Sequence, residues 1–122
     1  MYSEVILNEF YNPKNVGVIK GASAVGKIVS PVCGEIVKIF VTIEKGVIYD
    51  AKFQTYGSVP TIAATSKVTS DLIGRTLEEA DKITEVDVLS LIGGELPKSK
   101  EYIPSLMIEV IKDMIFEYNK NK

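Results

Sequence analysis

Two neighbouring segments in which apolar and polar side chains alternate constrain the fold of this chain more than any other feature. Residues 37–43 and 47–53 both show the pattern, and Glu44-Lys45-Gly46 separates them. A period of two is typical of a half-buried β-strand, and glycine tolerates the positive φ of a tight hairpin turn. We therefore predict an antiparallel hairpin with one apolar face, on which helices must pack. Phe40 is the one apolar residue expected on the outer face.

The remaining segments predict an α+β fold. Residues 18–25 are small and mixed and are expected to form a loop that leads into a short first strand at 26–31. Helical spacing, capping boxes and prolines suited to a first helical turn predict helices at 2–11, 60–73, 76–82, 84–91 and 104–118, with a polar link at 98–101. The expected architecture is a three-stranded antiparallel sheet with helices packed on one face, in a single domain of residues 1–122.

Charge and hydropathy exclude several classes of function. The chain has 14 basic and 16 acidic residues and a net charge of −2, so neither nucleic acid nor an anionic membrane is expected as a partner. No apolar run approaches the length needed to span a bilayer, and the first residues lack the pattern of a secretory signal. A single cysteine cannot form an intrachain disulfide, which fits a reducing compartment. We expect a cytoplasmic protein.

Cys33 is the only cysteine, and the chain contains no histidine. Cys-His and Ser-His catalytic pairs and imidazole metal sites therefore cannot form within one chain. A thiol enzyme would have only Lys27 or Lys38 nearby to favour the thiolate, so no catalytic residue is predicted. A lone cysteine is more often an inert small side chain, but Cys33 lies in a Pro-Val-Cys-Gly-Glu turn beside a carboxylate, not within an apolar run.

Several short motifs, taken in order, resemble the iron–sulfur cluster assembly scaffold family, which comprises the IscU proteins and the N-terminal domain of NifU. The family has a tyrosine followed by N-P-x-N-V-G, a first ligand motif C-G-D, and a strand that ends in T-Y-G before its second ligand. The corresponding segments here are 10–17, 32–35 and 50–57, and the segments 62–66, 74–80 and 95–97 also match. Each motif is short, but the ordered set covers nearly the whole chain.

The resemblance implies a [2Fe–2S] cluster held by three cysteines and an aspartate or histidine, and such a cluster needs four ligands. This chain departs from that set. Cys33 keeps the first thiol and Glu35 takes the place of the aspartate, whereas Ser58 occupies the second cysteine position. The third, which follows a histidine at the start of the last helix, falls at Ile103 or Pro104. We therefore predict a cofactor and metal site of Cys33 and Glu35, with Ser58, Ile103 and Pro104 as degenerate ligand positions.

Each of these residues also has a simpler interpretation. Glu35 could be a solvated carboxylate at a strand end, and Ser58 an N-cap residue for the following helix. Proline at position 104 favours the start of a helix and offers no metal ligand. Lys98 and Lys100 are expected to face solvent. They belong to Leu96-Pro97-Lys98-Ser99-Lys100, which keeps only the ends of the family's L-P-P-V-K chaperone motif, so chaperone recognition is not predicted.

Two functions remain. The first is an iron–sulfur scaffold that accepts sulfur from a cysteine desulfurase, or iron, at Cys33, with the missing ligands supplied by a second chain, such as that of a homodimer, or by a small thiol. The second is a degenerate scaffold that binds no cluster and acts as an interaction or regulatory module for assembly partners. Neither is an enzyme in the strict sense, because the chemistry belongs to the partner.

Overall fold

The three strands form the predicted antiparallel sheet, in the order β1-β2-β3. The structure is a computed structural model that describes residues 2–31 and 34–121. Strand β1 spans Ala24–Val29, β2 spans Ile36–Glu44 and β3 spans Val47–Tyr56. Lys45 and Gly46 connect β2 to β3 and both have positive φ, at 52° and 76°. This is the geometry of a tight two-residue hairpin, so the predicted turn is confirmed.

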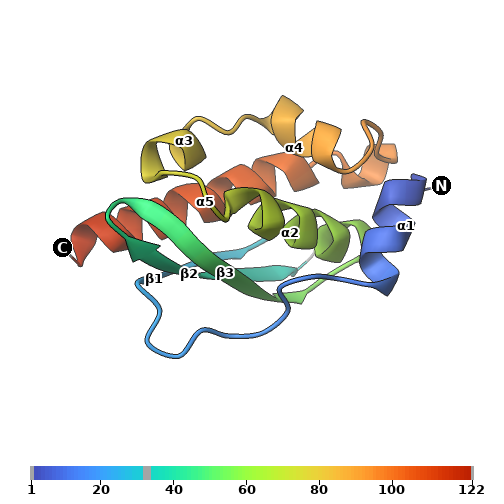
Figure 1. Ribbon diagram of the computed structural model, residues 1–122. Helices are drawn as coiled ribbons and strands as arrows, with labels where there is room; N and C mark the ends of the chain where they lie inside the picture. The colour runs from blue at the N-terminus through green and yellow to red at the C-terminus, as the bar shows by residue number, and fades with distance from the viewer. Residues whose placement is uncertain (1, 32–33, 122) are drawn as a thin grey trace.

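The longer helices lie on one face of the sheet, as predicted (Figure 1). Helix α1 spans Glu4–Tyr11, α2 Val59–Leu72, α3 Leu77–Asp81, α4 Glu85–Leu91 and α5 Ile103–Lys120. Helices α2 and α5 cover the sheet, and α3 and α4 lie beyond them (Figure 1). Buried side chains from every one of these strands and helices form one hydrophobic cluster. In the described part of the chain, no helix combines the length and apolar character that a bilayer crossing requires.

The N-P-K-N-V-G motif closes the outer edge of β3. The backbone N–H of Phe53 donates to the carbonyl of Asn15 at 2.8 Å, and the N–H of Gly17 donates to the carbonyl of Phe53 at 2.9 Å. Asn15 has a φ of 68°, and its amide donates to the hydroxyls of Thr69 and Ser70 on α2. The motif therefore has a structural role, because it covers an open sheet edge and anchors it to a helix.

The charged residues around this motif are paired within the fold. Glu9 is buried on α1, where it accepts a hydrogen bond from the Ser66 hydroxyl at 2.7 Å. The Lys14 ammonium lies 3.5 Å from the same carboxylate, and the Lys14 backbone N–H donates to the Ser66 hydroxyl. These contacts fasten α1 and the segment after it to the middle of α2.

Several sequence-based boundaries differ from the structure, most of them by one to three residues at the end of an element. The first strand begins at Ala24, not Gly26, because the Ser23 backbone N–H already pairs with the Val41 carbonyl. It ends before Pro31, which has no backbone N–H, and the Ser30 carbonyl accepts from the Gly34 N–H at 2.9 Å instead of from the partner strand. The predicted polar link contains a 3-10 turn at Lys98–Lys100.

Phe40 lies on the outer face as predicted but is only 8% exposed, and the Lys38 ammonium lies 5.5 Å from its ring centroid.

Candidate functional site

The Glu35 side chain joins three segments that are distant in the sequence. It immediately precedes β2 and is only 4% exposed. Its Oε2 atom accepts a hydrogen bond from the Ser58 backbone N–H at 2.8 Å, and the Thr61 hydroxyl lies 3.0 and 3.1 Å from its two oxygens. The Tyr102 hydroxyl donates to Oε1 at 2.5 Å. We call Glu35, Ser58, Thr61 and Tyr102 the Glu35 cluster.

Proton counting fixes the direction of the remaining bond in the Glu35 cluster. The Ser58 and Thr61 hydroxyl oxygens are 2.9 Å apart, and either could be the donor on distance alone. A hydroxyl has one proton, and an ionised Glu35 can only accept. Thr61 must then use its proton on Glu35, so Ser58 donates to Thr61. Ser58 is the N-cap residue of α2, as predicted, but its side chain makes no capping bond.

These hydrogen bonds also determine the charge state of Glu35. Burial raises the pKa of the Glu35 carboxyl, but the hydrogen bonds from Tyr102, the Ser58 backbone and Thr61 together outweigh it, and the pKa lies below its ordinary value. Donors that point at a carboxylate favour its ionised form. The group is therefore a buried anion held by polar groups, and among residues 2–31 and 34–121 no basic side chain donates a hydrogen bond to it.

The lowered pKa of Glu35 predicts a dependence of stability on pH. An unfolded glutamate titrates near pH ~4.3, and the folded state holds the proton less tightly, so the stabilisation is present above that pH. It is lost as the pH falls through the lower, folded-state pKa. We expect the difference in unfolding free energy between wild type and Glu35→Gln to be constant at neutral pH and to shrink in acid. Urea unfolding at pH 7, 5, 4 and 3, pH values chosen to bracket this transition, measures it, and a difference that grows in acid would contradict the assignment.

The structure brings most of the predicted site residues to one end of the sheet. Glu35 and Ser58 are in contact, and Ile103 and Pro104 begin α5 directly after Tyr102. Pro104 occupies the first helical turn, as expected, and Ile103 is fully buried. Cys33 lies outside the described residues. The interpretation of Glu35 as a solvated carboxylate is wrong, because three donors from α2 and the start of α5 surround it.

Two members of the Glu35 cluster, Thr61 and Tyr102, are absent from the sequence-based prediction. Tyr102 directly precedes Ile103, where the family pattern has a histidine before its third cysteine, so the resemblance carried a signal for it. Thr61 follows Ser58 by three residues, which places the two hydroxyls on one side of the first turn of α2. That spacing alone does not point to a buried carboxylate.

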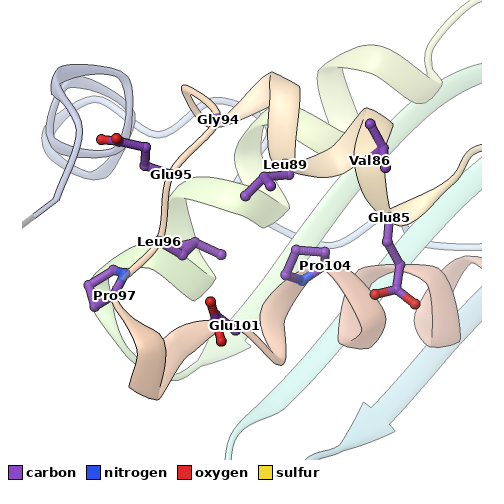
Figure 2. A pocket seen from close by; sticks show the side chains of 9 residues that line it. All are labelled: Glu85, Val86, Leu89, Gly94, Glu95, Leu96, Pro97, Glu101 and Pro104. Atoms are coloured by element: carbon purple, nitrogen blue, oxygen red, sulfur yellow. The ribbon is translucent and has the colours of Figure 1, made fainter.

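Two hollows lie near this end of the molecule. The larger, of about 570 Å³, lies between α4, the 94–97 segment and the start of α5. Figure 2 shows that its apolar lining includes Leu89, Leu96 and Pro104, and that Glu85 and Glu101 also line it. Of the predicted site residues that the structure describes, it includes only Pro104. The smaller hollow, of about 160 Å³, is lined by residues that include Ser30, Pro31 and Tyr102, and so adjoins the turn that carries Cys33.

The two lysines of the 96–100 segment differ in their surroundings. Lys98 is exposed, as predicted, whereas Lys100 is partly buried. The Lys100 ammonium lies 5.9 Å from the ring centroid of Tyr102, which is within the range of a cation–π contact. The segment therefore contacts the Glu35 cluster through the same tyrosine that binds Glu35.

Comparison with known protein families identifies the family of this chain. The family model described as "NifU-like N terminal domain" matches residues 1–122. The chain belongs to this family. Within the NifU-like N-terminal family, the IscU 1 scaffold protein of Archaeoglobus fulgidus is 40% identical over 118 residues, which are 97% of this chain and 76% of that protein. The IscU scaffold protein of Azotobacter vinelandii is 33% identical over 125 residues, covering 99% and 96%.

Solved structures agree with the assigned fold. The N-terminal NifU-like protein from Brucella abortus superposes with a TM-score of 0.83 at 17% sequence identity, covering 98% of this chain and 95% of the other. This likeness confirms the predicted α+β architecture of a three-stranded sheet with helices. Both curated relatives carry the name iron–sulfur cluster assembly scaffold protein, which favours the scaffold prediction over the interaction module.

The described side chains at this site do not make up the ligand set of a cluster. Ser58 and Tyr102 present hydroxyls, Ile103 presents an alkyl chain, and the Glu35 carboxylate already accepts three hydrogen bonds. Among residues 2–31 and 34–121, no group of three His, Cys, Asp or Glu side chains could hold a metal ion. A [2Fe–2S] cluster needs four ligands that are mostly thiolates, so ligands from outside this chain would be required.

Proposed function

We propose that this NifU-like protein works in iron–sulfur cluster assembly as a scaffold-family protein that accepts sulfur, or iron, at Cys33. The match of the family model to residues 1–122 is the observation that carries the proposal. Cys33 is retained in the C-G-E turn, and the segments on both sides of it are held by the sheet and the Glu35 cluster. A second copy of the chain or a small thiol would supply the ligands that this chain lacks.

Sulfur uptake requires a donor, for which a cysteine desulfurase is the natural class. The Cys33 thiolate would attack the terminal sulfur of a persulfide on the donor. The donor's S–S bond breaks as a new S–S bond forms on Cys33, and the donor leaves as a thiolate, so no external oxidant is needed. This chain is the acceptor, not the enzyme. The exchange needs a free thiol, which supports a reducing, cytoplasmic location.

A sulfur-transfer assay tests the proposal. We expect wild-type protein, incubated anaerobically with a cysteine desulfurase and cysteine, to gain the mass of one sulfur atom, which dithiothreitol removes. Cys33→Ser should gain none. The control is Cys33→Ser combined with Glu44→Cys, which places the only thiol at an exposed strand end. Equal transfer to that thiol would contradict a specific role for Cys33, as would the absence of transfer to wild type.

Anaerobic reconstitution with ferrous iron and sulfide separates the scaffold from the interaction module. Visible charge-transfer absorbance with stoichiometric iron, lost in Cys33→Ser, is expected of the scaffold. No bound iron, with unchanged desulfurase binding by Cys33→Ser, would instead support the module. The role of Glu35 as an iron or persulfide ligand stays a prediction, and it competes with the hydrogen bonds that the carboxylate makes in the fold.

A further inference from the structure

We infer that hydrogen bonds within the Glu35 cluster occupy both oxygens of the Glu35 carboxylate, so that it serves as a structural acceptor and not as a metal ligand. The inference deepens the proposed function, because it concerns the segment that carries Cys33. Three segments meet at Glu35: the residues directly before β2, the start of α2 and the start of α5. These are the segments on which the family pattern places its ligands.

The oxygens of Glu35 are already engaged. Oε1 accepts from Tyr102 at 2.5 Å, Oε2 accepts from the Ser58 N–H at 2.8 Å, and the Thr61 hydroxyl bridges both. Thr61 is fully buried, and Glu35 is 4% exposed. A metal ion at the carboxylate would displace at least one of these donors and leave it without an acceptor in a place with little access to water. Metal binding at Glu35 is therefore opposed by the fold.

The neighbouring side chains offer a metal little in return. The Ser58 hydroxyl donates to Thr61, and a neutral hydroxyl is a weak ligand. Ile103 is fully buried and has no donor atom. Gly57 also limits the room, because a β-carbon added there would lie 3.1 Å from Oε2 of Glu35. Together these contacts describe a packed, hydrogen-bonded junction and not an open coordination site.

The same junction fixes the ends of the turn that contains Cys33. The Ser30 N–H donates to the Glu35 carbonyl at 2.7 Å, and the Gly34 N–H donates to the Ser30 carbonyl at 2.9 Å. Glu35 thus closes the turn with its backbone and ties it to α2 and α5 with its side chain.

Zinc titration tests whether Glu35 binds a metal ion, since Zn²⁺ has no redox chemistry and binds thiolate and carboxylate ligands. Wild type, Glu35→Gln and Ser58→Cys/Ile103→Cys are treated with EDTA, desalted and titrated with Zn²⁺ against a competing chelator, and Tm is measured with and without the ion. We expect wild type and Glu35→Gln to have the same zinc affinity. The double cysteine variant, which restores three thiols, should gain one tightly bound ion and a Tm that rises by several degrees with zinc.

A wild-type protein that binds one Zn²⁺ at least tenfold more tightly than Glu35→Gln would overturn the inference. Tyr102→Phe provides a second measurement should Glu35→Gln fail to fold. If Glu35 is a structural acceptor, Tyr102→Phe lowers the Tm of EDTA-treated protein, because Glu35 loses a hydrogen-bond donor. An unchanged Tm would overturn the inference. Neither readout involves transfer of sulfur from a donor protein, so a failure here is distinct from a failure of sulfur transfer to Cys33.

Discussion

Replacing Gly26 by valine is expected to cost about 3 kcal/mol of unfolding free energy, the upper part of the usual range for overpacking. Gly26 lies in β1, where α5 passes so closely that a β-carbon would lie 2.5 Å from the Val110 carbonyl oxygen and 2.9 Å from the Met114 backbone nitrogen. Backbone atoms in the middle of a long helix cannot move aside independently. The whole contact between β1 and α5 would have to open.

Urea unfolding measures this effect, and Lys27→Ala is the matched control. Lys27 is the next residue in β1 and its side chain is exposed, while its backbone N–H donates to Asp113 on α5 and is unaffected by the substitution. We expect the control to stay within about 0.5 kcal/mol of wild type. A Gly26→Val protein as stable as wild type would show that β1 and α5 do not pack as closely as described.

The second large effect is expected at Glu35. Glu35→Ala removes the acceptor of the Ser58 N–H and of the Thr61 and Tyr102 hydroxyls. A buried donor that loses its partner costs about 1–3 kcal/mol, and water that enters the space left by the side chain recovers part of this. We expect a loss of about 3 kcal/mol in unfolding free energy at pH 7, measured by urea unfolding.

Glu44→Ala is the control for the Glu35 substitution. Glu44 is the last residue of β2, and Glu35 directly precedes the first. The side chain of Glu44, unlike that of Glu35, is exposed. The control should change stability by no more than about 0.5 kcal/mol. Glu35→Gln should lie between the two, because it keeps one acceptor oxygen. Equal stability of Glu35→Ala and Glu44→Ala would mean that the buried hydrogen bonds do not form in solution.

The residue types at the family's ligand positions could be predicted from the sequence. The C-G-E turn, the serine at 58 and the proline at 104 identified which ligands this chain has lost, and short motifs in order identified the family. The role of Glu35 as a buried hydrogen-bond acceptor could not be predicted. A glutamate after a glycine turn is usually solvated, and its burial depends on donors that lie 23, 26 and 67 residues away in the sequence.

Local patterns determined most of the fold. Alternation in 37–43 and 47–53 specified the hairpin, glycine at 46 specified its turn, and capping residues specified the starts of α3 and α4, because each of these signals depends on residues within one turn or one strand pair. Residue content also establishes that the chain has one thiol and no histidine. The tertiary structure alone decided that Gly26 must be small and that Glu35 is an internal acceptor, because both follow from contacts between segments that the backbone brings together from distant parts of the chain.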